Sequence, residues 1–276
     1  MFEARERAIA YSFREVDGER LHVADTATAD DAARTPLLVF NGIGASTRLL
    51  EPLLKRLVQH RVILFDLPGV GASRAASRVR RLPALADLSA RLLDQLGVGR
   101  VNALGVSWGG GLAQEFAYRH AARCEHLVLA ATSTGHVMVP PSPLVMLRMA
   151  TPLRYFSAGY AKAVAASIYG GDLRRDDARV DEHVRRMEPP SWWGYASQLY
   201  ALAGWTSLPW LHRLKVPTLV MAGSDDPLIP LVNARLLARL IPNAELEIYD
   251  CGHLFLLTRL GDVVSRLDGF LLGKRV

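Results

Sequence analysis

The segment Gly105-Val106-Ser107-Trp108-Gly109 has the pattern Gly-x-Ser-x-Gly, which is typical of a tight turn between a strand and a helix. An apolar run, 101–104, precedes it, and a helix candidate, 110–119, follows it. Small residues on both sides of Ser107 allow a strained turn that lifts the hydroxyl to the edge of a sheet. The adjoining helix N-terminus favours developing negative charge there. A glycine-rich turn without chemistry is the alternative, so the rest of the chain must supply partners for the serine.

Two later segments supply those partners, and each directly follows an apolar run. A serine hydroxyl becomes a useful nucleophile when a histidine accepts its proton and a carboxylate orients that histidine. Asp225-Asp226 and His253 stand after successive strand candidates, and loops of this kind meet at one edge of a parallel sheet. We therefore expect Ser107 as nucleophile, His253 as general base and Asp226 as its orienting carboxylate. Asp225 is the competing carboxylate, expected to cap the turn.

The loop after the apolar run 37–40 is a candidate oxyanion hole. Two backbone N–H donors must stabilise the tetrahedral intermediate of such a reaction. We expect the Trp108 N–H as one donor and the Ile43 N–H as the other, because the glycines of Asn41-Gly42-Ile43-Gly44 allow close backbone approach. We also expect Asn41 to lie against the substrate. A plain strand-to-helix turn is the alternative for this loop.

Apolar runs alternate with longer amphipathic stretches along most of the chain. The runs lack the alternation of half-exposed strands, as expected for parallel strands that are covered on both faces. The order predicts an α/β fold, with a mostly parallel central sheet, helices on both faces and a hairpin at 16–19. The runs are 37–40, 62–65, 101–104, 127–130, 218–221 and 246–249, and the helix candidates are 47–60, 82–96, 110–119, 231–240 and 262–272.

The alternation stops between residues 134 and 210, which are rich in Pro, Tyr and Trp. We expect an inserted, mainly helical cap, 134–210, on a core domain made of 1–133 and 211–276. Such a cap would cover the carboxyl edge of the sheet, where α/β folds bind ligands. Trp192, Trp193 and Trp205 are candidate substrate-binding residues, and a role in the cap's own core is the alternative.

The composition excludes several classes of protein. Half of the 276 residues are hydrophobic and 22% are charged, which is a globular composition. No segment is a candidate membrane span, and the charged N-terminus does not resemble a secretory signal. The net charge of +6 is not accompanied by a basic block, RNP-like pattern or zinc-finger spacing. We expect a cytoplasmic protein with no nucleic-acid partner, no metal site and no cofactor. Cys251, which lies beside His253 without a comparable turn, is expected to pack.

From about Leu37 onward the chain resembles the α/β-hydrolase superfamily, in which the catalytic residues follow the chain order Ser, Asp, His. More narrowly, it is similar to intracellular medium-chain-length poly(3-hydroxyalkanoate) depolymerases. Asn41 fits that narrower group, because many α/β-hydrolases have His at this position. The cap segments are the more specific part of the resemblance, since caps vary most among hydrolases. The segments that carry it are 40–45, 65–71, 105–110, 168–171, 204–207 and 252–256.

The resemblance implies a serine esterase that needs no cofactor. It would hydrolyse a stored aliphatic polyester through an acyl-enzyme on Ser107, release 3-hydroxy acids or oligomers, and meet a polymer granule as its partner. Two other functions remain open: a carboxylesterase, lactonase or C–C hydrolase with a small soluble substrate, and a non-catalytic ligand- or granule-binding protein on the same scaffold. Epoxide hydrolase and haloalkane dehalogenase chemistry is disfavoured, because those relatives have Asp in place of Ser107.

Overall fold

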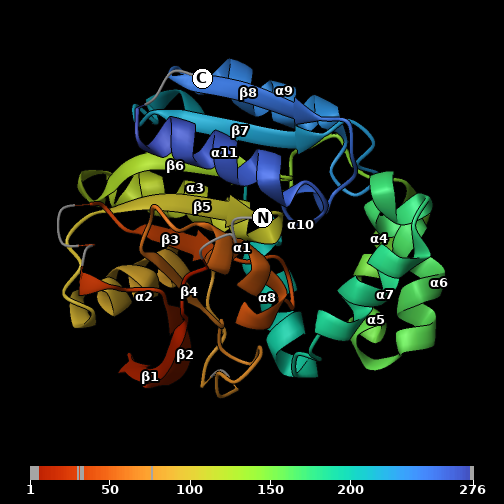
Figure 1. Cartoon of the computed structure of the whole chain (residues 1–276), viewed down its shortest axis with the longest axis horizontal. Coiled ribbons are helices and arrows are strands. Elements are labelled where there is room, and N and C mark those ends of the chain that lie inside the picture. Colours follow the sequence, from red (N-terminus) through yellow and green to blue (C-terminus); the bar gives the residue numbers. More distant parts are fainter. Residues whose placement is uncertain (1–5, 30, 32–33, 76, 274–276) are drawn as a thin grey trace.

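A single mixed sheet organises the chain. The computed structural model describes residues 6–29, 31, 34–75 and 77–273. Within these residues, eight strands form one sheet in the order β1-β2-β4-β3-β5-β6-β7-β8 (Figure 1). Only β2 pairs antiparallel, with β1 and with β4, so the predicted α/β fold with a mostly parallel sheet is confirmed. The strands are β1 (Ala10–Val16), β2 (Glu19–Asp25), β3 (Leu37–Phe40), β4 (Val62–Phe65), β5 (Val101–Val106), β6 (Cys124–Ala130), β7 (Thr218–Gly223) and β8 (Ala244–Tyr249).

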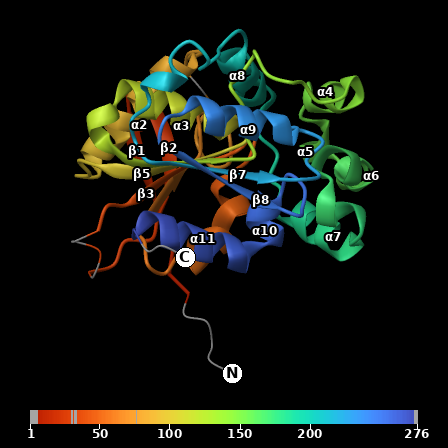
Figure 2. The same ribbon diagram turned by 90° about the horizontal axis from the view of Figure 1, so that it is seen from above.

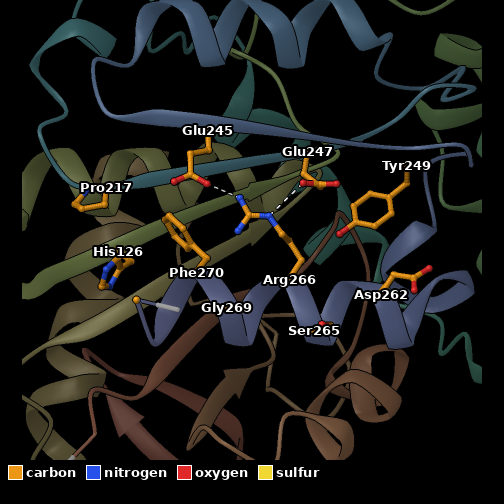
Figure 3. Close-up of a pocket in the computed structure, with 11 residues that line it drawn as sticks. His126, Pro217, Glu245, Glu247, Tyr249, Asp262, Ser265, Arg266, Gly269 and Phe270 are labelled. Atoms are coloured by element: carbon orange, nitrogen blue, oxygen red, sulfur yellow. Dashed lines mark hydrogen bonds and ion pairs between the residues drawn. The ribbon is translucent and has the colours of Figure 1, made fainter. Parts of the chain in front are cut away.

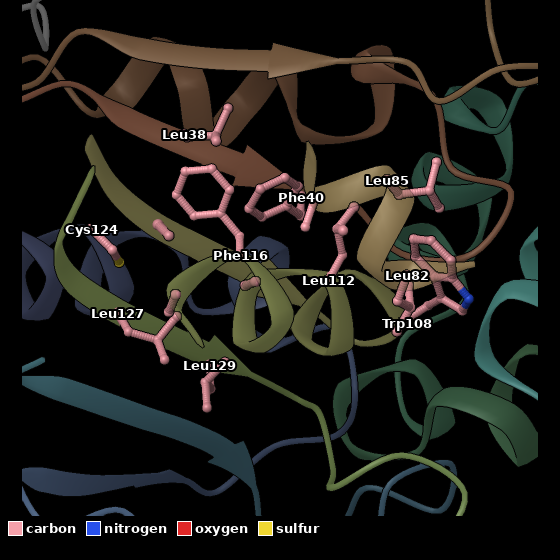
Figure 4. Packing of buried hydrophobic residues seen from close by; sticks show 14 of the residues in the cluster. Leu38, Phe40, Leu82, Leu85, Trp108, Leu112, Phe116, Cys124, Leu127 and Leu129 are labelled. Atoms are coloured by element: carbon pink, nitrogen blue, oxygen red, sulfur yellow. The ribbon is translucent and has the colours of Figure 1, made fainter. Parts of the chain in front are cut away.

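Helices cover both faces of the sheet (Figure 2). One face carries α2 (Leu82–Gln95), α3 (Trp108–Arg119) and α9 (Leu231–Leu240), and the other carries α1 (Glu51–Arg56), α10 (Phe255–Thr258) and α11 (Leu260–Leu271). This double cover explains why β3, β4 and β7 are buried along their whole length. Figure 4 shows the first face, where Phe116 of α3 packs against Phe40 of β3 with ring centroids 5.8 Å apart.

The helix predicted over 47–60 is shorter than expected. Thr47–Leu50 form a single 3₁₀ turn, and α1 then begins at Glu51 and ends at Arg56. Pro52 lies in the first turn of α1, where its missing N–H is tolerated, so it starts a new helix there. Leu57 leaves the helical conformation with ψ near 58°. The apolar periodicity predicts a helix at this place correctly, but it continues past the end of the helix.

The segment between β6 and β7 is helical, and Figures 1 and 2 both place α4 to α7 beyond the carboxyl ends of the parallel strands. Its two ends lie side by side, because Gly135 and Thr206 form an isolated bridge. None of the described helices is long and apolar enough to span a membrane. The helices are α4 (Pro143–Met149), α5 (Leu153–Phe156), α6 (Ala158–Tyr169), α7 (Asp177–Arg186) and α8 (Trp192–Leu202).

Candidate active site

Ser107 occupies a strained turn between β5 and α3. Its φ is +54° and its ψ is −119°, a conformation that residues other than glycine rarely adopt. The Ser107 N–H donates to the Ala130 carbonyl at 2.8 Å. The Ser107 carbonyl accepts from the Gly110 N–H at 2.9 Å and from the Thr132 hydroxyl at 2.7 Å. Hydrogen bonds on both sides of the residue therefore hold the strained conformation in place.

Sterics explain the two glycines that flank this turn. A Cβ at Gly105 would lie 2.5 Å from the Gly109 carbonyl oxygen, and a Cβ at Gly109 would overlap the carbonyl oxygens of Phe40 and Asn41. These obstacles are backbone atoms, which cannot rotate away. The Gly-x-Ser-x-Gly pattern is thus required by the close approach of α3 to β5 and to the end of β3.

His253 and Asp226 form a buried pair at the same edge of the sheet. The His253 Nδ1 lies 2.7 Å from the Asp226 Oδ2, and both residues are less than a tenth exposed. The other carboxylate oxygen accepts the Leu228 and Ile229 N–H groups, each at 2.9 Å, which fixes the carboxylate. A carboxylate at Nδ1 favours the tautomer whose Nε2 can accept a proton. The pair therefore has the geometry of a base and its orienting group.

The alternative residues have other partners. Asp225 forms an ion pair with Arg174 at 2.7 Å and accepts the Gly171 N–H at 2.8 Å, so it holds the turn after α6. Cys251 is buried, and its sulfur lies 3.0 Å from the Thr258 hydroxyl. The geometry thus favours Asp226 over Asp225 as the partner of His253, and a packing role for Cys251.

Two backbone N–H groups are available for an oxyanion. In the loop after β3, the N–H groups of Gly42 and Gly44 donate to side-chain oxygens at 2.9 and 2.6 Å. Within the described part of the chain, the Ile43 N–H between them makes no hydrogen bond, and neither does the Trp108 N–H at the start of α3. Both N–H groups therefore fit the predicted role of oxyanion donors.

Asn41 shapes this loop from within. Its Oδ1 accepts the Gly42 N–H at 2.9 Å, and its Nδ2 donates to the Ser46 carbonyl at 2.8 Å. Asn41 does line the pocket beside Ser107, as expected for a substrate contact. Both polar ends of its side chain are engaged in the loop, however, so the geometry favours a role in holding the loop that carries Ile43.

Ser107, Ile43 and His253 line one narrow pocket, which we call the serine pocket. It encloses about 60 Å³, and polar side chains from the helical segment close it, among them Arg154 and His183. An apolar pocket with a few polar groups suits an aliphatic ester. Its apolar side chains are Ala45, Leu49, Leu50, Val106, Met149, Leu228, Leu254, Leu256 and Leu257.

The three tryptophans predicted to bind substrate do not line the serine pocket. Trp205 is buried against α3, and its Nε1 donates to the Glu115 carboxylate at 2.7 Å. Trp192 and Trp193 begin α8 and are 56% and 53% exposed. Trp205 fits the alternative of a packing role, and aromatic enrichment carries no information on which side chains face the serine.

Arg154, Tyr155 and His183 also line the serine pocket, although the sequence did not predict them. The Tyr155 hydroxyl donates to the Ile43 carbonyl at 2.7 Å, so α5 rests directly on the oxyanion loop. Burial and the positive charge of Arg154 lower the pKa of His183 from 6.5 to about 3, so its imidazole is neutral at neutral pH. No motif marks these residues, and only the placement of the helices over the sheet edge brings them to the serine pocket.

A larger cavity of about 750 Å³ lies between β8 and α11 (Figure 3), and neither Ser107 nor His253 lines it. Arg266 crosses it and pairs with Glu245 and with Glu247, whose carboxylate lies 3.2 Å from the Arg266 Nε. Arg266 balances only one of these two carboxylates, and among the residues that line the cavity no nucleophile is paired with an oriented base. The described residues also include no cluster of three or more His, Cys, Asp or Glu side chains placed to hold a metal ion.

Comparisons with known proteins extend over nearly the whole chain. Residues 35–260 match the family model described as the alpha/beta hydrolase fold. The chain is 48% identical over 266 residues to a poly(3-hydroxyalkanoate) depolymerase of Ectopseudomonas oleovorans, and the match covers 96% of this chain and 94% of that protein. It is 26% identical to 3-oxoadipate enol-lactonase 2 of Acinetobacter baylyi, over 84% of this chain and 91% of the relative.

Solved structures show the same fold. The enol-lactonase from Burkholderia xenovorans LB400 has a TM-score of 0.80 and 24% identity, with 95% of this chain and 100% of that chain covered. A hydrolase from Pseudomonas aeruginosa PA01 has a TM-score of 0.79 and 27% identity, with 95% and 98% covered. The similarity in sequence to the depolymerase is far greater than the similarity to either of these structures.

Proposed function

The chain belongs to the α/β-hydrolase fold family, and we propose that it hydrolyses the ester bonds of medium-chain-length poly(3-hydroxyalkanoate) to 3-hydroxy acids or oligomers. The observation that carries this proposal is the 48% identity to a poly(3-hydroxyalkanoate) depolymerase over 96% of the chain. The apolar wall of the serine pocket supports it, because the alkyl side chains of such a polyester are apolar.

In the proposed reaction, the Ser107 Oγ attacks the ester carbonyl carbon while His253 takes the hydroxyl proton. Asp226 keeps the imidazole in the required tautomer and stabilises the imidazolium. The N–H groups of Ile43 and Trp108 stabilise the oxyanion. The carbon–oxygen bond to the leaving group then breaks, and His253 returns the proton to the leaving alkoxide. A water molecule activated by the same base hydrolyses the acyl-enzyme and releases the acid.

In this proposal, residues 134–210 form a cap on a core domain of 1–133 and 211–276. The Tyr155 hydroxyl bonded to the Ile43 carbonyl supports this division, because it fastens a cap helix to the oxyanion loop of the core. The small volume of the serine pocket also supports it. A polymer segment is much larger than this volume, so the cap has to move before the segment reaches the serine.

The proposed location is the cytoplasm, at the surface of a polyester granule. Exposed apolar side chains on the cap helices support this placement, since such side chains favour contact with an apolar surface. Phe156 of α5 and Trp192 of α8 stack with centroids 5.5 Å apart, and both are about half exposed. Leu153 and Trp193 are similarly exposed on the same two helices.

The test compares purified medium-chain polymer, short-chain polymer and p-nitrophenyl esters of increasing chain length as substrates. We expect the medium-chain polymer to be degraded, and Ser107→Ala to lose all hydrolysis while keeping the thermal unfolding transition of the wild type. Cleavage of soluble esters alone would favour a second candidate function, that of a carboxylesterase or lactonase. The small volume of the serine pocket also suits the small substrate of such an enzyme. A protein that neither cleaves esters nor reacts with a fluorophosphonate at Ser107 would be a binding protein.

A further inference from the structure

Arg154 is a buried cation in the serine pocket whose protein partners are all neutral. It is only 3% exposed. Its Nη1 donates to the Tyr195 hydroxyl at 3.0 Å and to the Thr151 carbonyl at 3.3 Å, and its guanidinium lies over the Tyr155 and Tyr195 rings. Within the described residues its Nε has no hydrogen-bond partner, and the ion pairs of the cap join other residues.

Such a cation is costly to bury. Arginine keeps its charge in proteins, and a charge removed from water needs stabilisation from an opposite charge, from hydrogen bonds or from aromatic faces. The two tyrosine rings supply part of this stabilisation. The Nε donor and the net positive charge of Arg154 remain unbalanced on the wall of a pocket that receives substrate. The group best suited to this position is an anion that arrives with the substrate.

His183 lies on the wall of the same pocket and is also short of partners. It is 6% exposed, and within the described part of the chain neither ring nitrogen makes a hydrogen bond. The Tyr169 ring packs against both histidines, with centroids 4.9 Å from His183 and 6.3 Å from His253. His183 is therefore one aromatic ring away from the proposed base. As a neutral imidazole it can donate one hydrogen bond to an anion.

We propose that Arg154 and His183 form an anion subsite for the free carboxylate at the carboxyl terminus of an ester oligomer. This inference rests on the proposed function and goes further, because it specifies which ester bond of the polymer chain is cleaved. A 3-hydroxy acid unit is short, so its terminal carboxylate lies close to the last ester bond. An anion held by Arg154 thus presents that bond to Ser107. An internal repeat carries only neutral ester oxygens, which leave the buried charge unbalanced.

The subsite makes the enzyme release monomers from the carboxyl end. The bond between the Ser107 Oγ and the carbonyl carbon forms, and the bond from that carbon to the alkoxy oxygen of the terminal unit breaks. That oxygen receives the proton from His253, and the 3-hydroxy acid leaves with its carboxylate intact. Water then adds to the acyl carbon and frees the shortened oligomer, whose new terminal carboxylate is the next ligand for Arg154.

The test uses the linear dimer of 3-hydroxyoctanoic acid and the methyl ester of the same dimer. For cleavage of the internal ester by the wild type, we expect kcat/KM to be about 30-fold higher for the free acid. In Arg154→Gln, the ratio of kcat/KM for the free acid to kcat/KM for the methyl ester should fall to about three or less. Arg154→Lys should keep part of the preference for the free acid, because the ammonium group keeps the positive charge but lacks the planar guanidinium. Arg185→Gln removes a charge from an exposed position on α7 and should leave the ratio unchanged.

The ratio of the two kcat/KM values separates anion binding by Arg154 from a purely structural role. A loosened cap would lower the rates for the free acid and for the methyl ester together, and the ratio would then stay the same. A wild-type ratio near one, or a ratio that folded Arg154→Gln retains, would overturn the subsite while the esterase proposal stands. His183→Phe is expected to lower the ratio about threefold, and an unchanged ratio would remove His183 from the subsite.

Two further measurements keep the result interpretable. Hydrolysis of the methyl ester and labelling of Ser107 by a fluorophosphonate report on the esterase alone, so failure of both overturns the proposed function and the subsite with it. If Arg154→Gln does not fold, inhibition of the wild type decides the matter. We expect 3-hydroxyoctanoate to inhibit at about 30-fold lower concentration than its methyl ester, and equal inhibition contradicts the subsite.

Discussion

Replacing His183 by Phe should make the stability of the protein less sensitive to acid. In the folded chain this imidazole is buried, packs against the Tyr169 ring and lies near the positive charges of Arg154 and Arg186. Burial, followed by these charges, lowers the pKa of His183 from 6.5 to about 3. In the unfolded chain the same side chain is in water, where a histidine titrates near its ordinary pKa of about 6.5.

The size of the effect follows from the difference between the two pKa values. Between pH 6.5 and about 3, the unfolded state binds a proton at this position that the folded state does not bind. The free energy of unfolding therefore falls as the pH falls, by up to about 1.4 kcal/mol per unit. The full contribution is present above pH 6.5. At pH 5 the free energy of unfolding is lower by about 2 kcal/mol. This value depends only on the pKa of the histidine in the unfolded chain, because the folded imidazole is still neutral at pH 5.

The assay is urea unfolding at pH 7.5, 6.0 and 5.0 for the wild type, His183→Phe and the control His136→Phe, which alters an exposed histidine. The stability difference between the wild type and His183→Phe should shift by about 2 kcal/mol across this range, in favour of the variant at low pH. The other titrating groups are common to both proteins and cancel. A stability difference between the wild type and His183→Phe that stays constant across this pH range would refute the assignment of His183 as a buried neutral base.

Three further predictions concern the His253–Asp226 pair, the Gly-x-Ser-x-Gly turn and Trp205. Asp226→Asn should lower kcat for p-nitrophenyl esters about 10⁴-fold, because the His253 imidazole loses its orienting carboxylate. The control Asp225→Asn should leave kcat within about threefold of the wild type. Equal losses in the two variants would contradict Asp226 as the orienting carboxylate. Gly109→Ala places a Cβ against backbone oxygens and should cost at least about 3 kcal/mol in a thermal melt, and an unchanged Tm would show that the Gly-x-Ser-x-Gly turn can relax. Trp205→Phe leaves the Glu115 carboxylate buried without its hydrogen-bond donor and should lower the free energy of unfolding by about 1–3 kcal/mol, with KM unchanged. A raised KM would indicate that Trp205 contacts the substrate.

The fold was predictable because its decisive elements carry local signals. A strand that is covered on both faces has to be apolar throughout, so the runs 37–40, 62–65 and 218–221 identified β3, β4 and β7 directly. Where two signals conflicted, sequence reasoning failed. The apolar period over 47–60 continues past the helix, and Pro52 together with the backbone at Leu57 sets the real bounds of α1.

That the candidate catalytic residues lie together was predictable for a topological reason. Loops after parallel strands converge, so Ser107 and His253 share a pocket although 145 residues lie between them in the sequence. The choice between Asp225 and Asp226 has no such basis, since both stand in one turn. It depends on which carboxylate meets the N–H groups that follow, and backbone geometry at Leu228 decides it.

The orientation of the side chains in the helical segment 134–210 was beyond sequence reasoning because burial rules are statistical. Aromatic residues are expected inside, yet Trp192 is more than half exposed, and arginine is expected outside, yet Arg154 is almost fully buried. Deviations of this kind are tolerated where function compensates for them. The exposed tryptophan is compensated if it meets an apolar granule, and the buried arginine if it meets a carboxylate. In the two proposals, the helical segment thus has two roles: Trp192 contacts the surface of the polymer granule, and Arg154 binds the carboxylate at the end of a polymer chain.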